Sequence, residues 1–250
     1  MSDERGVSEV LGYVLVIGVV TATIAVVMTV GVGGLEAAQE AERTNNMERA
    51  FDVLAENFET IYVGEAPSRA TEIRLLDGEL GYTDPAELSV TIDGDPIDNL
   101  SVESHPIAYN DGAGTVIAYE AGSIIRAQDN HSVMLREPSF IVEEDEAVLP
   151  LVRTRPESGS LDRIGGHGTI LIIAEALDTT VATEEWSVDN KTVEVTVRTD
   201  HPKAWAQYFD GLDHPDGAVE EASDEVTYQY TTDEHTITVV VQRLRLTISP

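Results

Sequence analysis

The sequence predicts an α+β protein. A long amino-terminal helix, first transmembrane and then amphipathic, is followed by a mostly antiparallel β-sandwich or barrel-like domain with one short helix. Residues 10–32 form an uncharged apolar run, and residues 35–62 repeat apolar side chains at steps of three and four. After residue 64 the apolar period changes to two, and turn-forming residues separate short runs. Frequent turns between runs of period two are typical of antiparallel sheets.

The apolar run VLGYVLVIGVVTATIAVVMTVGV, residues 10–32, is long enough to cross a bilayer. As a helix it would extend about 34 Å, slightly more than the hydrocarbon core. A helix also satisfies its own backbone hydrogen bonds, as a single segment in lipid must. No other stretch of the sequence is comparably apolar. We therefore expect one membrane-spanning helix, with the membrane as its partner.

The helical pattern continues beyond the apolar run. The polar triplet Thr44-Asn45-Asn46 predicts a kink or a contact with the folded domain. A stripe of apolar residues runs along one side of this second half: Leu35, Ala38, Met47, Ala50, Phe51, Leu54, Phe58 and Ile61. Such a stripe predicts packing beneath the folded domain. Because Pro67 ends the helix, we expect one long helix over residues 7–63 and a β-rich domain over residues 64–250.

The β-rich part contains short runs separated by Asp-Gly, Asn-Asp-Gly and Gly-Gly turn signals. Strands are predicted over residues 71–76, 87–92, 115–119, 132–135, 140–142, 148–152, 169–176, 192–198, 225–230 and 236–248. One helix interrupts them at residues 202–209, and its Trp205 and Phe209 share a face that would plug the sheet. The last strand changes phase between Val241 and Leu244, which predicts a bulge near Gln242 that keeps both halves facing the core.

The chain is strongly acidic, with 46 Asp and Glu against 15 Lys and Arg and a net charge of −31. Such a surface repels nucleic acid and anionic headgroups, so we expect no nucleic-acid partner. Lysine occurs only at positions 191 and 203. The chain resembles haloarchaeal proteins in its diffuse acidity and its scarcity of lysine. Such proteins function in concentrated salt, which screens the repulsion between like charges. The absence of cysteine excludes disulfides, thiolate metal sites and cysteine nucleophiles.

Motifs that carry catalysis are missing from the sequence: it has no nucleophile elbow, phosphate loop, dinucleotide fingerprint or zinc-binding His-Glu-x-x-His helix. We therefore expect no enzyme, no cofactor and no catalytic residue. The histidines show no metal-ligand spacing. Acidic clusters at residues 93–98, 143–146 and 210–216 offer the oxygen ligands that Ca²⁺ prefers, but clusters also arise by chance in so acidic a chain. No metal site is predicted.

The residues just before the apolar run carry a short processing signal. Arg5 and Gly6 stand ahead of Val7, Ser8 and Glu9. This arrangement resembles the class III signal peptide of archaeal, especially haloarchaeal, type IV pilins and archaellins. The resemblance covers about the first quarter of the chain. It implies that residues 1–6 are a leader, that cleavage falls between Gly6 and Val7, and that the apolar helix stays on the mature protein. Glu9 would be the third mature residue, whereas bacterial type IV pilins place a glutamate fifth.

The same resemblance implies partners and a function. A prepilin peptidase would trim the precursor, and an assembly ATPase with a polytopic platform protein, the pilus assembly machinery, would extract it from the membrane. Other pilin-like subunits would then pack against the apolar helix in a filament. The implied function is that of a type IV pilin-like surface protein.

The flanks of the apolar run suggest its orientation. Arg5 precedes the run, whereas acidic residues follow it, which favours a cytoplasmic amino end and an external carboxyl end. The expected location is the cell membrane with the β-rich domain outside, or an extracellular filament. Three Asn-x-Ser/Thr sequons, at Asn99, Asn130 and Asn190, fall in the external part and are candidate glycosylation sites.

Other interpretations of the amino-terminal segment remain open at this point. Small residues follow the run at positions 33, 34, 37 and 38, where an ordinary secretory signal would be cut. Alternatively, the run is a simple single-pass anchor that displays an extracellular β domain for binding or adhesion and does not polymerise. An anchored hydrolase is a third class, but no set of residues in the sequence supports it.

Overall fold

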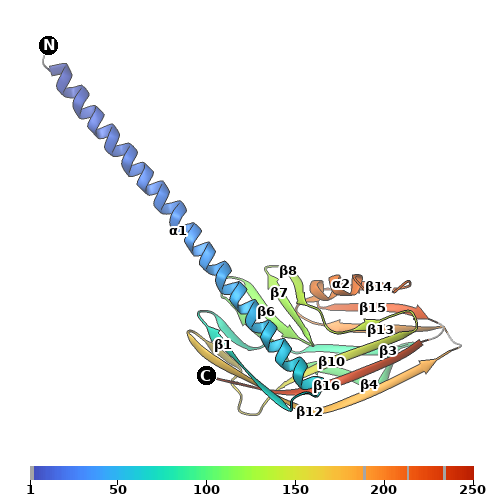
Figure 1. The fold of residues 1–250 in the computed structure, drawn as a ribbon. Coiled ribbons are helices and arrows are strands. Elements are labelled where there is room, and N and C mark those ends of the chain that lie inside the picture. The colour runs from blue at the N-terminus through green and yellow to red at the C-terminus, as the bar shows by residue number, and fades with distance from the viewer. Residues whose placement is uncertain (1–2, 188–189, 213, 233–234) are drawn as a thin grey trace. The chain divides into compact units, whose positions relative to one another are not determined.

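A computed structural model shows one long helix, α1 (Asp3–Tyr62), followed by strands and one short helix, α2 (Pro202–Asp210) (Figure 1). It describes residues 3–187, 190–212, 214–232 and 235–250, without the side chains of 3–9, 30–32, 36–37 and 98–100. The predicted α+β class, with a mostly antiparallel β-rich domain and a short second helix, is confirmed.

The chain divides into two compact units, and the boundary between them falls inside α1. The first, called the helix unit, ends at Asn46; the second, called the β unit, comprises Met47–Pro250. The boundary coincides with the polar triplet Thr44-Asn45-Asn46, through which α1 continues as a helix. The last four turns of α1 therefore belong to the β unit.

Helix α1 ends in a glycine cap. Gly64 adopts φ of +85°, a conformation that side chains with a Cβ rarely take. Its N–H donates to the Ile61 carbonyl at 3.0 Å, and the Glu65 N–H donates to the Thr60 carbonyl at 3.0 Å. This pair of bonds is the Schellman arrangement, which satisfies carbonyls that the helix itself leaves free. The helix thus stops before Pro67 is reached.

The described residues of the β unit form three sheets, called sheets 1, 2 and 3. Sheet 1 has the order β1 (Ser68–Leu75), β12 (Gly168–Trp186), β16 (His235–Ser249), β10 (Glu146–Pro156), β9 (Ile141–Val142). Sheet 2 has the order β11 (Arg163–Gly165), β2 (Glu79–Tyr82), β5 (Ile107–Asn110), β6 (Thr115–Glu120), β7 (Ser123–Gln128), β8 (His131–Arg136). Sheet 3 has the order β14 (Ala218–Glu221), β15 (Glu225–Thr232), β13 (Lys191–Arg198), β3 (Ala86–Ile92), β4 (Asp95–Ser104). The pairs are antiparallel except β10 with β16, which run parallel.

One hydrophobic cluster lies between α1, sheet 2 and one end of sheet 1. Phe51, Leu54 and Phe58 of α1 are at most 1% exposed in it. The Phe58 ring meets the Tyr119 ring edge-on at 4.9 Å between centroids, a favoured aromatic geometry. Ion pairs at the rim join the same elements, with Arg126 Nη1 2.8 Å from Glu48 Oε1 and Arg136 Nη1 3.2 Å from Asp52 Oδ1. The predicted apolar stripe thus packs within the β unit from Met47 onward.

A second cluster lies between sheet 3, α2 and the other end of sheet 1. As predicted, Trp205 and Phe209 of α2 are buried in it. Trp205 Nε1–H donates to Glu120 Oε1 at 2.7 Å, and the Thr199 hydroxyl donates to the same carboxylate at 2.8 Å. Glu120 is 2% exposed, and burial raises the pKa of its carboxyl group. This buried network joins α2 to the end of β6.

Strand β16 contributes to both clusters. Its residues Ile237, Val239 and Val241 lie in the cluster with α2, whereas Leu244, Leu246 and Ile248 lie in the cluster with α1. The register shift lies on the neighbouring strand β12, between Ala176 and Thr179, and the β10–β16 pairing is continuous. Since side chains alternate along an unbroken strand, Val241 and Leu244 point to opposite faces of sheet 1. The phase change that predicted one bulged strand on a single core instead marks a strand shared by two cores.

Candidate functional site

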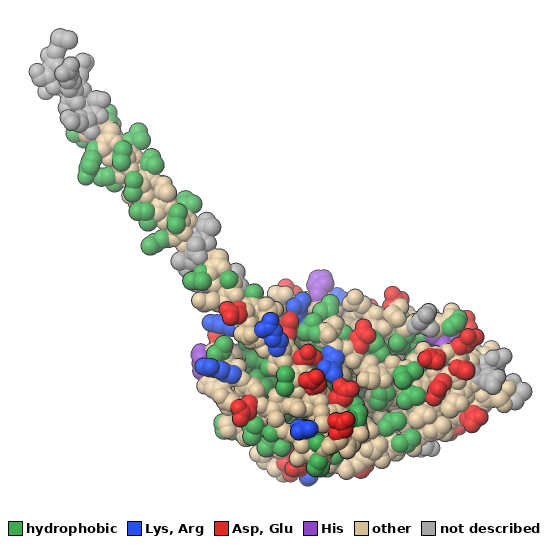
Figure 2. Space-filling view, viewed as in Figure 1, with side chains coloured by type: hydrophobic (Ala, Val, Ile, Leu, Met, Phe, Trp, Pro, Cys, Tyr) green, Lys and Arg blue, Asp and Glu red, His purple; other side chains and the backbone are tan. Residues whose placement is uncertain are grey.

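The helix unit presents an uninterrupted apolar surface. Large apolar side chains from Val10 to Met28 are between 47% and 69% exposed, and α1 is long and apolar enough to span a membrane. Figure 2 shows these hydrophobic side chains along the helix. The Thr23 hydroxyl donates to the Val19 carbonyl at 2.8 Å, and Thr29 bonds to the Ala25 carbonyl in the same way. Because both hydroxyls are satisfied within the helix, they do not oppose an apolar environment.

Glycines on this segment leave room beside the helix. A Cβ built on Gly12 or Gly18 would meet no heavy atom within 4 Å. Neither glycine is therefore required by a contact within the described chain. Small residues at such positions allow another helix to approach closely.

The predicted processing residues Arg5, Gly6, Val7, Ser8 and Glu9 lie in the first turns of α1, which begins at Asp3. Their side chains fall outside the part of the chain that the structure describes. Processing between Gly6 and Val7 remains a prediction from the sequence.

The three sequons lie at different places in the β unit. Asn99 is in β4, and its side chain lies outside the described residues. Asn130 is exposed in the turn between β7 and β8, where its carbonyl accepts a 2.6 Å hydrogen bond from Lys203 Nζ. Asn190 is exposed directly before β13 and lines a cleft.

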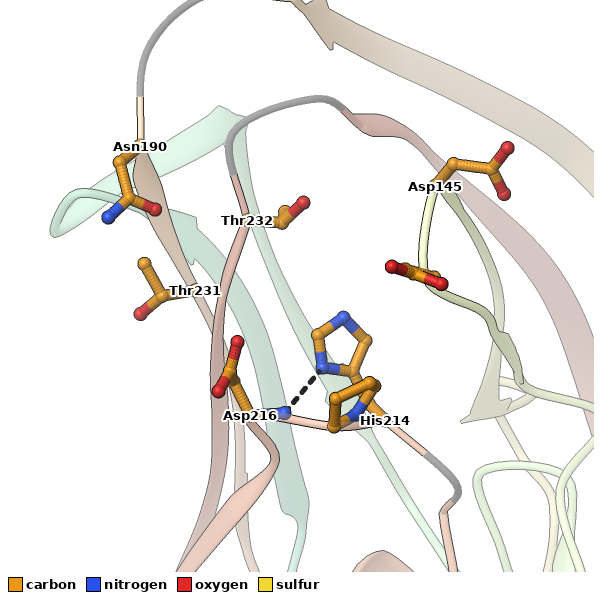
Figure 3. A pocket seen from close by; sticks show the side chains of 8 residues that line it. Asp145, Asn190, His214, Asp216, Thr231 and Thr232 are labelled. Carbon is orange, nitrogen blue, oxygen red and sulfur yellow. Dashed lines mark hydrogen bonds between the residues drawn. The ribbon is translucent and has the colours of Figure 1, made fainter.

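That cleft, called the loop cleft, has a volume of about 750 Å³ and is formed by loops and strand ends far apart in the sequence (Figure 3). Its lining residues are Glu144, Asp145, Asn190, His214, Pro215, Asp216, Thr231 and Thr232. The acidic pair comes from the turn before β10, the His214–Asp216 segment follows α2, and the threonines end β15. Acidic stretches that are separate in the sequence thus meet around one histidine.

His214 is the most buried polar side chain of the loop cleft, with 8% of its surface exposed. The Asp216 N–H donates to His214 Nδ1 at 3.3 Å, whereas Nε2 is buried and has no hydrogen-bond partner among the described residues. Figure 3 shows this second nitrogen turned toward the space between Thr232 and Asp145. Burial lowers the pKa of His214, and the nearby Asp216 and Glu144 carboxylates only partly offset it. Because a ring nitrogen that accepts a hydrogen bond carries no proton, the His214 ring is neutral in this arrangement.

A second layer of contacts holds the His214 ring. Its centroid lies 4.3 Å from that of Tyr230. The Tyr230 hydroxyl lies 3.0 Å from His235 Nε2, and His235 Nδ1 lies 3.4 Å from the Glu144 carbonyl. A carbonyl only accepts, so His235 Nδ1–H donates to it and Nε2 accepts from Tyr230. These contacts hold the Tyr230 ring in place, and the His214 ring packs against that ring.

The sequence shows some of the segments that line the loop cleft, but not that these segments lie close together in the fold. Two of the acidic clusters considered for Ca²⁺ supply Glu144, Asp145 and Asp216, while Asp213 lies outside the described residues. Among the residues that the structure describes, no group of three or more His, Asp and Glu side chains is placed to hold a metal ion. His214 has no sequence signal, because its surroundings combine the neighbouring Asp216 with segments between 17 and 70 residues away in the sequence.

Comparison with known proteins adds a family but no activity. A family of unknown function (DUF7289) matches residues 5–247, nearly the whole chain. No curated protein matches it.

Proposed function

We infer the function of this chain, which belongs to the family of unknown function DUF7289, from its own residues. We propose a type IV pilin-like surface protein, held in the membrane as a precursor, processed after Gly6 and assembled through its apolar helix into a filament. The observation that carries the proposal is the exposed apolar surface from Val10 to Met28.

Such a surface requires an apolar environment. Each buried Å² of apolar area contributes about 25 cal/mol relative to water, so a helix exposed on all sides is stable only in lipid or among similar helices. In the precursor, lipid provides this apolar environment. In the filament, a bundle of identical helices provides it. Gly12, Gly18, Ala22 and Ala25 provide the small positions that close helix packing uses.

The acidic β unit suits the outside of such an assembly. Figure 2 shows acidic side chains scattered over its visible face, in line with the net charge of −31. Like charges on neighbouring subunits repel, and concentrated salt screens that repulsion. In this proposal the subunit acts by assembly and binding, and its partners are the membrane, the prepilin peptidase with the assembly machinery, and its own copies.

The mass of the mature amino terminus tests the proposal. Cleavage predicts a mature chain that begins at Val7, whereas an unprocessed anchor begins at Met1 or Ser2. Gly6→Ile places a bulky side chain at the cleavage position, and we expect the longer form to accumulate in the membrane and surface filaments to be lost. Gly33→Ile is the matched control, because a Cβ there meets nothing within 4 Å. A wild-type protein that still begins at Met1 or Ser2, together with filaments that persist in Gly6→Ile, would contradict the proposal.

The loop cleft favours a second candidate function. A cleft of about 750 Å³ on the β unit also suits a single-pass anchor that displays a binding or adhesion domain and does not polymerise. Cross-linking of the mature protein in its native membrane separates the two candidates. Cysteines introduced at Gly12 and Gly18 should form disulfide-linked ladders in a filament but only isolated species in a monomeric anchor.

A further inference from the structure

The protonation of His214 defines what the loop cleft can bind. Its Nδ1 accepts the Asp216 N–H, so a neutral ring must carry its proton on Nε2. That N–H is buried, lies at the cleft and has no partner among the described residues. A buried donor without an acceptor is costly, and native proteins rarely leave one. None of the described residues accepts a hydrogen bond from this N–H, so a bound ligand would have to supply the acceptor.

The surrounding side chains call for hydrogen-bond donors on the ligand, in contrast to the acceptor that His214 requires. The carboxylates of Glu144, Asp145 and Asp216 only accept hydrogen bonds when ionised. Asn190 and Thr231, also in the lining, both donate and accept. A ligand that fits must hence present an acceptor to His214 and donors to the rim. A hydroxyl group does both, and several hydroxyl groups on one molecule match the whole lining.

Other ligand classes fail on one of these two requirements. Anions are repelled by the three carboxylates and by the net charge of −31. Ammonium and guanidinium groups satisfy the carboxylates but have no acceptor for Nε2–H. A metal ion needs the Nε2 lone pair, which the proton occupies, and no set of three ligands is assembled among the described residues. We propose that the loop cleft binds a neutral saccharide.

The size and placement of the cleft agree with this ligand class. Small-molecule sites are commonly about 300–1,000 Å³, and the loop cleft, at about 750 Å³, can hold a short oligosaccharide. Asn190, in a sequon, is exposed at its edge. The saccharide can therefore come from two sources, a separate glycan or a glycan attached to Asn190 itself. The proposal concerns the β unit alone and does not depend on whether α1 polymerises.

A binding titration on the full chain tests the proposal. The protein is made without glycosylation, kept in concentrated KCl and held in a detergent whose headgroup is not a sugar, since a glycoside detergent would compete. Glucose, galactose, mannose and their neutral trisaccharides are the probes, and isothermal titration and ¹⁵N-histidine NMR are the readouts. We expect at least one probe to bind and to shift the Nε2 resonance of a ring that is protonated there.

Variants locate the binding. His214→Phe keeps a ring on Tyr230 but removes the donor, and we expect it to weaken binding at least about tenfold, the value of one buried hydrogen bond. His131→Phe makes the same change at an exposed histidine on β8 and should bind as the wild type does. Asp216→Asn, at the exposed rim, provides a second variant if His214→Phe does not fold. Thermal unfolding verifies the fold of each variant.

The two sources are separated by glycosylated material. Thr192→Val removes the sequon and leaves Asn190 in place. If the occupant is the attached glycan, the glycosylated wild type should refuse added sugar, whereas glycosylated Thr192→Val should bind it; if the glycan is separate, both should bind. Three results would overturn the proposal: no binding of any probe, equal affinity in His214→Phe and His131→Phe, or a His214 ring without a proton on Nε2.

Discussion

At the scale of single residues, the β unit buries ionisable groups and supplies each with different partners. Glu120 receives hydrogen bonds from Trp205 and Thr199, so its charge is partly compensated although it is buried. His235 is tied to Tyr230 and to the Glu144 carbonyl. His214 alone among these three keeps a polar atom without a partner within the described chain, and it is also the one that lines the loop cleft.

Glu120 predicts a pH-dependent stability difference. Burial raises the pKa of its carboxyl group, so its contribution to stability is fully present below the unfolded-state pKa and is lost as the pH rises through the folded-state pKa. Glu120→Gln keeps an acceptor for Trp205 but cannot ionise. We therefore expect the melting temperature of the variant, relative to the wild type, to increase from pH 5 to pH 8.

Circular dichroism melts across this pH range measure the effect. Glu72→Gln, which makes the same change at an exposed side chain of β1, is the control. A difference between Glu120→Gln and the wild type that stays constant, or that shrinks as the pH rises, would show that the buried carboxyl group does not titrate in the proposed way.

At the scale of elements, α1 combines two unlike surfaces. From Val10 to Met28 its large apolar side chains are exposed, whereas Met47, Phe51, Leu54, Phe58 and Ile61 are buried. The second half therefore fixes the β unit to the helix, and the first half is free for lipid or for other helices. Both surfaces belong to one continuous helix, with no linker between them.

Two substitutions on neighbouring turns of α1 test this division. Phe58→Ala should lower the free energy of unfolding by about 3–5 kcal/mol, because it leaves a cavity under sheet 2. Val53 is 50% exposed, and Val53→Ala should change the free energy by about 0.5 kcal/mol or less. Chemical denaturation measures both. Equal losses would mean that α1 does not pack in the cluster described here.

The elements also show what the sequence allows one to predict. For strands such as β3 and β13, one face is buried and the other is not, so apolar and polar residues alternate. Their predicted bounds, residues 87–92 and 192–198, lie within one residue of the observed ones. In contrast, β5 (Ile107–Asn110) and β7 (Ser123–Gln128) bury three consecutive residues, so period two vanishes and neither was predicted. The polar second half of β12 (Gly168–Trp186) was missed as well, because a bulge interrupts its pattern.

The loop cleft was beyond prediction for a related reason. Glu144, Asn190, His214 and Thr231 come from four segments whose meeting depends on the parallel pairing of β10 with β16 and on the position of α2. No local pattern encodes such pairing. The apolar segment of residues 10–32 is the opposite case, because the length and the apolar character of one continuous stretch define it.

At the scale of the whole molecule, charge governs the conditions under which the β unit is stable. Only 15 basic residues oppose 46 acidic ones, and ion pairs such as Arg136–Asp52 and Arg198–Glu87 are exposed at the surface, where each contributes little. Net repulsion among the remaining carboxylates therefore opposes the compact state. Salt is the direct remedy, because it shortens the range of that repulsion.

Stability should consequently rise with salt. We expect the melting temperature of the full chain in detergent to increase between 0.1 M and 2 M KCl, where the Debye length falls from about 10 Å to below about 3 Å. Sucrose at equal osmolality is the control for effects that do not involve charge. A melting temperature that falls with KCl, or that responds equally to sucrose, would show that repulsion does not limit stability.

Strand β16 has a consequence for the timing of folding. Residues 235–249 supply one wall of each hydrophobic cluster, so neither interior can close before they have left the ribosome. Until then the nascent chain carries two incomplete hydrophobic clusters. Both hydrophobic clusters therefore wait for one and the same strand, and if the β unit is exported as the proposed function requires, this delay keeps it unfolded during export.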